Sequence, residues 1–518
     1  MDKLVSIVIP VYNAEKTLRK SVESIVYGRY ANVEVILVDD CSCDGSWELC
    51  CQLRDSYSQV KCVQNPVNSG VAVTRNHGLD VATGEYICFV DSDDWVCCRF
   101  VESLVTEAVL HPDELPVCGF RFINYLDNQT ANYLLPPNDQ NGFFLPRTET
   151  FQLLNHVWLQ CVWNKIFHAD VIKRHNIQFP PGKSMGEDFD FVLTYLEKAQ
   201  CAGYRIINAP LYYYIRANTT SLMSQFGLSR FDEEATRYGR VYSICSDQSA
   251  EVDYQKSLQA LKNNFYYHIL SAKQLSKADK LDRIKNISKD GNELQHYRNA
   301  QRIYRKEGIF KQLSRCKATI NRGLAITKRL SVKYRIARAR HKLSGHDLSI
   351  ISQNCIGGVL YHDLGQSFRS PTINLYMNAK DFAKFATDLR GYLSLPLQMH
   401  WEEEYPIGLL GDITIRFMHY DTCTDAVCAW QRRCDRIDWD RILVLTTDRD
   451  GFTNAEFEMW KQLPYPKVLF TSNPAFANHE DSVFFRKYQK YGCVPDLIPE
   501  REFYRKGKVV RAFQRCIR

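Results

Sequence analysis

The sequence lacks long uninterrupted hydrophobic runs, internal repeats and low-complexity tracts. No apolar stretch approaches the roughly 18 residues that a membrane-spanning helix needs, and the amino terminus has neither the cationic start nor the cleavage site of a signal peptide. With 25 glycines and 18 prolines in 518 residues, it also lacks the composition of collagenous or wholly disordered chains. These absences leave a globular protein, which we expect to remain in the cytoplasm.

The 19 cysteines are numerous, but they do not form the patterns of a metal or redox site. Closely spaced pairs lack the two-residue gap that is usual in zinc and redox motifs. These pairs are Cys41 with Cys43, Cys50 with Cys51, and Cys97 with Cys98. Because Cys88 and Cys118 also lie in strand-like apolar runs, we interpret most cysteines as reduced, buried, small apolar residues.

Positive charge is concentrated in one segment. Residues 298–342 contain 15 Lys or Arg residues and a single acid, Glu307, whereas the formal charge of the whole chain is only +7. Two interpretations stay open: a helix packed on its own domain with a solvated basic side, or an interfacial helix on an anionic membrane surface. Aromatic residues for base stacking are scarce there, so no nucleic-acid partner is expected.

The first hundred residues alternate short apolar runs with amphipathic stretches, which predicts a parallel sheet with helices on its faces. The predicted strands are residues 4–11, 33–38 and 86–90, and the predicted helices are residues 15–26 and 46–54. In such sheets, ligands bind beyond the carboxyl ends of the strands. Polar residues directly after these runs are therefore candidates for a binding site.

A chain of this length is expected to hold two or three domains. Glycine is sparse and apolar spacing is helical after the first α/β part, and strand-like runs return after Gly345. The later strands are predicted at residues 348–352, 371–377, 413–420, 441–446 and 467–471, and the later helices at residues 379–393, 425–436 and 454–463. We predict an N-terminal α/β domain at residues 1–227, a helical basic connector at residues 228–345 and a second α/β domain at residues 346–518.

An acidic motif, Asp91-Ser92-Asp93-Asp94-Trp95, follows the predicted strand at residues 86–90. Closely spaced carboxylates repel one another unless a cation or solvent offsets their charge. Oxygen ligands suit Mg²⁺ or Mn²⁺, which commonly bind one or two carboxylates together with substrate phosphates. The alternative is a solvated acidic turn that caps a helix starting near Val96.

Four blocks in order give the N-terminal part a specific resemblance. They read VSIVIPVYNAEKTLRKSVESI, VEVILVDDCSCDGS, NSGVAVTRNHGL and GEYICFVDSDDW. Over roughly residues 3–223, this pattern resembles the family 2 glycosyltransferases of the GT-A fold. The resemblance implies a Rossmann-like domain that binds a nucleotide-diphosphate sugar, with UDP the expected nucleotide.

The resemblance also implies roles for individual residues. Pro10, Tyr12 and Asn13 match the nucleotide-facing loop after the first strand, and Asp39 or Asp40 matches the carboxylate that hydrogen-bonds the base. Arg75 matches a basic residue near the donor's base and phosphates, where a guanidinium pairs with diphosphate oxygens in a fork geometry. Asp91 and Asp93 match the metal-binding acidic motif, which implies Mn²⁺ or Mg²⁺ as cofactor.

The blocks CVWNKIF and GEDFDF resemble the acceptor side of the same family. An inverting transfer needs a carboxylate base that takes the proton of the acceptor hydroxyl. Asp188 is the expected base, and Glu187 shapes the site or binds the acceptor. Alternatively, both acids stabilise the first turn of a helix through its dipole. Arg216, in the aromatic stretch LYYYIRANTTSLM, is a further candidate for a diphosphate contact.

The second α/β part resembles a domain of unknown function from bacterial polysaccharide loci, carried by SQNCIGGVLYHDLG, SPTINLYM and LFTSNPAF. The run Asn354-Cys355 opens a glycine-rich turn after a predicted strand, and His362 and His419 lie near strand or turn ends. A Cys355 nucleophile assisted by a histidine, or an oxyanion site built on Asn354, would make this part an acyl- or phosphoryl-transfer module. A binding module and a purely structural role stay open.

The expected function is therefore an inverting, metal-dependent transfer of a sugar from a nucleotide-diphosphate donor to a growing bacterial surface glycan or lipid-linked acceptor. The basic segment would then hold the enzyme on the inner face of the cytoplasmic membrane. Two alternatives remain: a sugar-nucleotide-binding module that serves a catalytic C-terminal domain, or a non-catalytic assembly scaffold.

Overall fold

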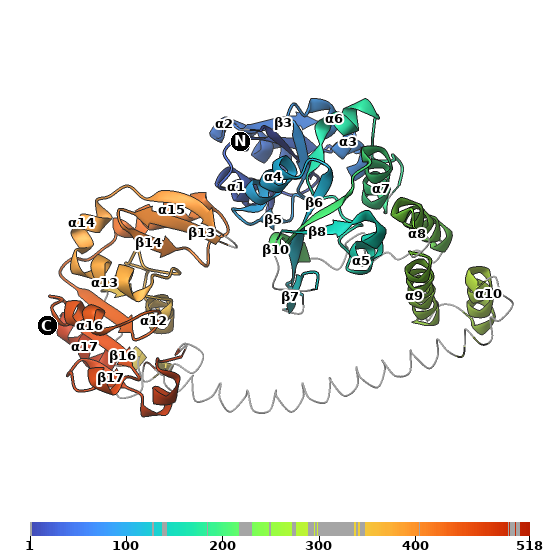
Figure 1. The fold of residues 1–518 in the computed structure, drawn as a ribbon. Coiled ribbons are helices and arrows are strands. Elements are labelled where there is room, and N and C mark those ends of the chain that lie inside the picture. Colours follow the sequence, from blue (N-terminus) through green and yellow to red (C-terminus); the bar gives the residue numbers. More distant parts are fainter. Residues whose placement is uncertain are drawn as a thin grey trace. The chain divides into compact units, whose positions relative to one another are not determined.

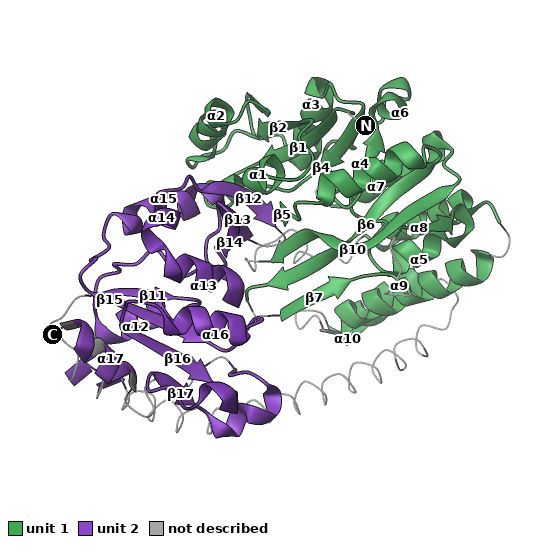
Figure 2. Ribbon diagram, turned by 60° about the vertical axis from the view of Figure 1, so that its left-hand side comes forward, with its two compact units in different colours: residues 1–314 green, residues 315–518 purple. Residues whose placement is uncertain are grey.

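The computed structural model describes residues 3–126, 129–136, 142–183, 185–216, 230–247, 250–271, 276–288, 348–402, 405–495 and 508–517, with a few isolated positions at 295, 298, 336–337, 340–341, 497 and 503. The basic segment predicted to bind membranes therefore lies almost wholly outside the described residues. The chain divides into two compact units, residues 1–314 and 315–518 (Figure 2). The predicted domain boundaries stay predictions.

The N-terminal unit begins with a parallel sheet in the order β3-β2-β1-β4, extended by the antiparallel strand β9. The first residues of this unit are the blue part of the ribbon in Figure 1. These strands are β1 (Val5–Val11), β2 (Val33–Asp39), β3 (Val60–Gln64), β4 (Tyr86–Phe89) and β9 (Phe167–His168). Helices α1 (Leu18–Val26), α2 (Ser46–Ser56) and α3 (Val71–Val81) alternate with them. Every residue of β1 and β2 is buried, as expected for continuous apolar strands covered on both faces. The predicted α/β fold with a parallel sheet is confirmed.

A second, mixed sheet follows in the same unit. Its strands are β5 (Trp95–Val96), β6 (Glu114–Asn124), β7 (Gln129–Tyr133), β8 (Phe143–Pro146) and β10 (Gly203–Arg216), accompanied by helices α4 (Phe100–Leu110), α5 (Thr150–Asn155), α6 (Ala169–Arg174) and α7 (Glu187–Ala199). The helix expected near Val96 begins instead at Phe100, because Val96 pairs with Tyr212 of β10. This pairing places β10 directly beside the acidic motif.

Helices α8 (Phe231–Cys245), α9 (Glu251–Ser271) and α10 (Lys277–Ser288) form the described part of the predicted helical region. Apolar side chains that include Phe231, Phe265 and Ile269 are buried among these helices. The spacing of apolar residues thus predicted the element type correctly in this part of the chain.

The C-terminal unit is a second α/β fold, also as predicted. Its parallel sheet has the order β11-β15-β16-β17, and β12, β13 and β14 form an antiparallel meander. The strands are β11 (Ser349–Ser352), β12 (Gln398–Glu402), β13 (Tyr405–Leu410), β14 (Ile413–Arg416), β15 (Ile442–Thr447), β16 (Lys467–Thr471) and β17 (Ser482–Phe484). The helices are α12 (Ile356–Leu364), α13 (Ala379–Thr387), α14 (Leu389–Leu393), α15 (Cys423–Cys434), α16 (Asn454–Lys461) and α17 (Lys508–Ile517).

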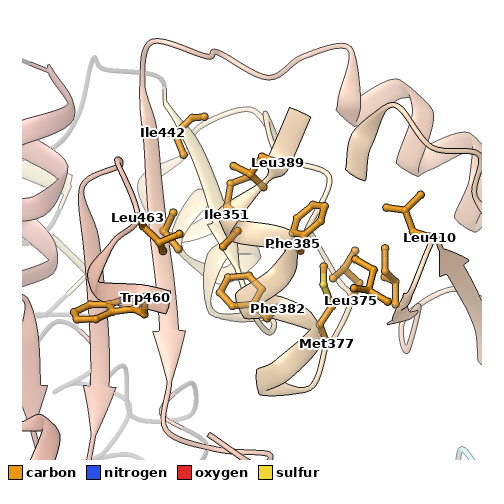
Figure 3. Close-up of a cluster of buried hydrophobic side chains, with 14 of the residues drawn as sticks. Ile351, Leu375, Met377, Phe382, Phe385, Leu389, Leu410, Ile442, Trp460 and Leu463 are labelled. Atoms are coloured by element: carbon orange, nitrogen blue, oxygen red, sulfur yellow. The ribbon is translucent and has the colours of Figure 1, made fainter. Parts of the chain in front are cut away.

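One core of this unit gathers apolar side chains from its sheets and helices (Figure 3). Phe382 and Phe385 of α13 lie with Ile351 of β11 in this cluster, and all three are almost completely buried. Burial of such side chains removes apolar surface from water and fixes the helices on the sheet.

Two element predictions in this unit were wrong. Residues 371–377 are not a strand: Asn374 has a φ of 58°, which interrupts an extended backbone, and only Tyr376 forms an isolated bridge, to Arg416. The predicted helix at residues 379–393 is two helices, because the Asp388 side chain accepts a hydrogen bond from the Gly391 N–H and starts α14.

Candidate active site

The acidic motif lies at the carboxyl end of β4, where the parallel sheet meets β10. Asp94 is buried, and its carboxylate accepts hydrogen bonds from the Tyr212 hydroxyl at 2.7 Å and the Ile215 N–H at 2.7 Å. The Tyr212 hydroxyl in turn accepts a hydrogen bond from the Asp91 N–H at 3.1 Å. Burial, and then the charges of Asp93 and Asp91, raise the pKa of Asp94 well above its usual value. Asp94 thus anchors the turn that presents Asp91 and Asp93.

Asp91 and Asp93 are the carboxylates of the motif that stay accessible. The Asp91 side chain is partly exposed and Asp93 is exposed. Although the residue is exposed, neighbouring protein atoms reduce the hydration of its carboxyl group, and this effect, followed by the negative charge of Asp91, raises the pKa of Asp93 to about 6. Two neighbouring carboxylates with a mutual charge penalty match the oxygen ligands that Mg²⁺ takes together with substrate phosphates.

Arg75 of α3 connects this motif to a second acidic pair. Its guanidinium is buried and contacts Asp91 Oδ1 through Nη2 at 2.8 Å and Asp188 Oδ1 through Nη1 at 2.6 Å. Glu187 Oε1 lies 3.6 Å from the same Nη1. One cation is therefore shared by three carboxylates that come from two distant parts of the sequence.

The charge balance of this cluster is negative. Burial alone lowers the pKa of Arg75, but the surrounding carboxylates of Asp188, Asp91 and Glu187 outweigh it and raise this pKa. Burial raises the pKa of Asp188 to about 7; Arg75 opposes this shift, and Glu187 and Asp91 add to it. A carboxyl group with a pKa near neutrality is suited to accept a proton at physiological pH.

Asp188 is held by the start of α7. Gly186 caps this helix with a φ of 84°, a conformation that glycine adopts readily, and a Cβ at this position would lie 2.5 Å from Nη2 of Arg237. The glycine thus permits both the turn and the close approach of Arg237. Glu187 is buried, and its Oε2 has no hydrogen-bond partner among the described residues.

A second ion-pair cluster fixes α7 to α8. Asp190 accepts hydrogen bonds from Arg237 Nε at 3.0 Å and from Arg240 Nη1 at 3.3 Å, and Lys183 contacts its other oxygen at 2.7 Å. Burial alone raises the pKa of Asp190, but Arg237 and Lys183 outweigh it and lower this pKa. The helix that carries Asp188 is therefore positioned by residues outside the resemblance blocks.

The two aspartates at the end of β2 have different partners. Asp39 accepts hydrogen bonds from the Ser42 hydroxyl at 2.5 Å and from Gln64 Nε2 at 3.0 Å. Asp40 accepts hydrogen bonds from the N–H groups of Ser69 at 2.9 Å and Gly70 at 2.8 Å, directly before α3. Asp40 thus secures the start of the helix that carries Arg75.

The remaining donor-side candidates lie at strand ends. Pro10 belongs to β1, and Tyr12 follows it with half of its side chain exposed. Asn13 has a φ of 51°, and its side-chain oxygen accepts a hydrogen bond from the Cys43 N–H at 3.0 Å. Arg216 is exposed at the end of β10, and residues 217–229 lie outside the described part of the chain.

The C-terminal candidates divide into a pair and an outlier. Cys355 Sγ lies 3.2 Å from His419 Nε2, and Asn354 Nδ2 donates a hydrogen bond to Thr447 Oγ1 at 3.4 Å. The His362 side chain is 83% exposed and lies beside Asp363 rather than beside Cys355. The structure therefore brings one of the two candidate histidines to the thiol.

Sequence reasoning did not single out Asp94, Tyr212 or the contact between Arg75 and Asp188. Asp94 and Tyr212 are 118 residues apart in the chain, and neither has a local signature of its role. Lys165, inside CVWNKIF, is also completely buried, and burial lowers its pKa to about 8. The signal available in the sequence was a lysine among the mostly apolar residues of CVWNKIF.

No group of three or more His, Cys, Asp and Glu side chains within the described ranges is arranged to hold a metal on its own. Asp91 and Asp93 would therefore need ligands from a bound substrate. No helix among the residues that the structure describes is both long and apolar enough to cross a membrane.

Curated proteins and solved structures show similarity to this chain over limited parts of its length. An uncharacterized protein of Haemophilus influenzae is 36% identical over 161 residues, which are 31% of this chain and 78% of that protein. UDP-Glc:alpha-D-GlcNAc-diphosphoundecaprenol beta-1,3-glucosyltransferase WfaP of Escherichia coli is 42% identical over 148 residues, 28% of this chain and 56% of WfaP. Staphylococcus aureus TarS 1-349 in complex with UDP-GlcNAc matches at 20% identity and a TM-score of 0.38, covering 57% of this chain and 79% of that chain.

Two family models match separate parts of the sequence. The model described as glycosyl transferase family 2 matches residues 6–175, which include β1 to β4, Arg75 and the acidic motif. A model described as a domain of unknown function, DUF1919, matches residues 326–515. The chain thus carries a glycosyl transferase family 2 domain in its N-terminal unit and a DUF1919 domain in its C-terminal unit.

Proposed function

We propose that the N-terminal unit is an inverting, metal-dependent glycosyltransferase that moves a sugar from a UDP-sugar to a growing bacterial surface glycan or a lipid-linked acceptor. The observation that supports this most is the Arg75 guanidinium, which joins Asp91 on the donor side to Asp188 on the acceptor side at 2.8 and 2.6 Å. The family match, and the UDP-Glc donor and diphosphoundecaprenol acceptor in the name of WfaP, support the choice of substrates.

Asp188 is proposed as the general base. Its carboxylate takes the proton of the acceptor hydroxyl while the hydroxyl oxygen attacks the anomeric carbon and the bond to the nucleoside diphosphate breaks. Arg75 orients Asp188 and keeps part of its negative charge compensated before the proton arrives. Glu187, which faces the same guanidinium, sets the electrostatic potential around the base.

Asp91 and Asp93 are proposed to hold Mg²⁺ or Mn²⁺ with the donor's pyrophosphate. When bound, such an ion stabilises the negative charge that develops on the departing diphosphate. Asp94 and Tyr212 fix the backbone of this turn, so that Asp91 and Asp93 need not reorganise.

The test is release of UDP from a panel of UDP-sugars in the presence of Mn²⁺ or Mg²⁺. The proposal expects release by the natural chain, loss of release in Asp188→Asn, and unchanged release in the control Asp170→Asn, whose side chain is an exposed acid on α6. Metal-independent release, or an active Asp188→Asn variant, would contradict it.

Attachment to the membrane is the remaining part of the proposal. The positive charge of residues 298–342 supports contact with an anionic cytoplasmic leaflet, where lipid-linked acceptors are found. This part rests on the sequence, because the segment lies outside the described residues.

A further inference from the structure

The C-terminal unit has a second cluster of chemically competent side chains, at the carboxyl edge of its parallel sheet. Gln353, Asn354 and Cys355 follow β11, and Thr447 ends the neighbouring strand β15. Ligands of open α/β sheets bind at this edge, where loops leave the strands. The cluster is thus in a position where such folds place binding and catalytic groups.

Cys355 and His419 form the centre of this cluster. Their Sγ and Nε2 atoms are 3.2 Å apart although 64 residues separate them in sequence. Cys355 is half-buried at the N-cap of α12, and His419 is exposed. An adjacent imidazole and the positive end of a helix both favour the thiolate form of a cysteine. The pair is therefore accessible, and the thiol lies both beside an imidazole and at the start of a helix.

Gln353, two residues before Cys355, has a buried amide whose donor lacks a partner among the described residues. Gln353 is completely buried, and its Oε1 accepts hydrogen bonds from the N–H and the hydroxyl of Thr447, each at 3.1 Å. Its Nε2 has no partner among the described residues. Leaving such a donor unpaired in a protein interior is unfavourable. This cost is removed if the oxygen of a ligand accepts the hydrogen bond.

The amide of Asn354 belongs to the same network. Its Oδ1 accepts a hydrogen bond from the Ile356 N–H at 3.2 Å, and its Nδ2 points to the Thr447 hydroxyl at 3.4 Å. Neutral amide donors on the two residues before the thiol suit the oxygen of a carbonyl group, on which negative charge develops during thiol attack.

Some buried or half-buried cysteines elsewhere in the chain have thiols with raised pKa values. Burial raises the pKa of the Cys88 and Cys434 thiols, that of Cys434 to about 12, which keeps them protonated. A zinc site is also a poor explanation of the Cys355 and His419 pair, because structural and catalytic zinc sites use three or four protein ligands. No such group occurs in the parts of the chain that the structure describes.

We propose that Cys355 is a nucleophile and His419 its general base in an acyl-transfer site of the C-terminal unit. The Cys355 sulfur attacks the carbonyl carbon of an acyl ester or thioester, and His419 passes the thiol proton to the leaving alcohol or thiol. The resulting thioester is then attacked by a sugar hydroxyl or by water, whose proton goes to His419, and the Cys355 thiol is regenerated. Gln353 and Asn354 supply donors for the carbonyl oxygen.

The first experiment measures alkylation of the full chain by iodoacetamide, quantified for each cysteine by peptide mass spectrometry between pH 5 and 9. The exposed Cys428 is the internal control. Cys355 is expected to react faster than Cys428 at pH 6, and His419→Gln is expected to remove this advantage while leaving Cys428 unchanged. Equal rates for the two cysteines, or no effect of His419→Gln, would overturn the proposal.

The second experiment uses p-nitrophenyl acetate as a neutral acyl probe and p-nitrophenyl phosphate as a phosphoryl probe. With the first probe, we expect acetylation of Cys355 and release of p-nitrophenolate. The rate of release should fall about a hundredfold in His419→Gln. Neither reaction should occur in Cys355→Ser. His362→Gln, which changes an exposed histidine away from the thiol, is the matched control and should behave as the natural chain. Reaction with the phosphate probe alone, or acetylation spread over other cysteines, would contradict acyl transfer at this site. A melting curve for each variant excludes unfolding as the cause.

Discussion

Arg75 and Asp188 are separated by 113 positions in the sequence, yet Nη1 of the arginine lies 2.6 Å from Oδ1 of the aspartate. The same guanidinium holds Asp91 through its other terminal nitrogen. Because one side chain contacts both acidic groups of the proposed reaction, changes to it affect the donor side and the acceptor side together.

Arg75→Lys is expected to lower turnover of a UDP-sugar and to lower the melting temperature. Lysine keeps the charge but cannot span two carboxylates as a planar guanidinium does. Breaking a buried ion pair commonly costs about 3–5 kcal/mol. Arg174→Lys, in an exposed pair with Asp170, is the matched control and should leave both values unchanged. Turnover equal to that of the natural chain would show that the shared guanidinium is dispensable.

The rate of sugar transfer is expected to increase as the pH rises through about 7, the pKa of Asp188, because only the ionised carboxylate accepts the acceptor's proton. A pH–rate profile under saturating donor and acceptor checks this. A flat profile between pH 5.5 and 8.5, with chemistry rate-limiting, would argue against Asp188 as the base.

The same pKa has a consequence for stability. The pKa of Asp188 is raised in the folded state above its usual value of 3.8, so the folded chain binds more protons than the unfolded chain between these values. The contribution of Asp188 to stability therefore falls as the pH rises from about 4 to 7. The melting temperature of Asp188→Asn, measured without ligands, should therefore increase relative to that of the natural chain as the pH is raised from 5 to 8. The opposite trend would show that Arg75 dominates the titration.

Tyr212→Phe removes a hydroxyl that donates to Asp94 and accepts from the Asp91 N–H. We expect a loss of about 1–3 kcal/mol of stability, since a buried carboxyl loses its donor, together with weaker binding of Mn²⁺ and UDP. Tyr204→Phe, on the same strand, removes a single hydrogen bond to Thr150 and is the matched control. Isothermal titration should show weaker binding for the first variant only.

Asp93→Asn is expected to abolish the increase in melting temperature that Mn²⁺ produces together with UDP, because a ligand that binds the native state alone raises that temperature by mass action. The exposed Asp55, changed to Asn, provides the comparison. A metal-dependent shift of equal size in both variants would move the metal site elsewhere.

Residues 298–342 are expected to bind vesicles that contain anionic lipid and to release them as salt increases. Replacing a third of their Lys and Arg residues by Gln should weaken co-sedimentation, whereas vesicles of neutral lipid should not bind either form. Vesicle binding that does not depend on lipid charge or salt concentration would favour the other interpretation, in which this segment is a helix packed on its own domain.

The sequence was informative where chemistry and spacing coincide locally. Asp91 and Asp93 follow a continuous apolar strand, so their place at a sheet edge was predictable. The shared role of Arg75 was not, because its partner Asp188 is fixed by α7 and the packing of α8. In the C-terminal unit, His362 is close to Cys355 in sequence but lies elsewhere, and only the tertiary fold selects His419. The failed strand at residues 371–377 reflects a left-handed Asn374 that apolar spacing does not reveal.

The contacts of Arg237 and Arg240 with Asp190 determine where the N-terminal glycosyltransferase part can be cut from the chain. A fragment that stops at residue 227 would lack both arginines. Of the three cations that contact Asp190 here, it would keep Lys183 alone. Helix α7, which carries the proposed base Asp188, would then lose its ion pairs with α8. A fragment that extends to residue 288 keeps Arg237 and Arg240, and with them the ion pairs to Asp190.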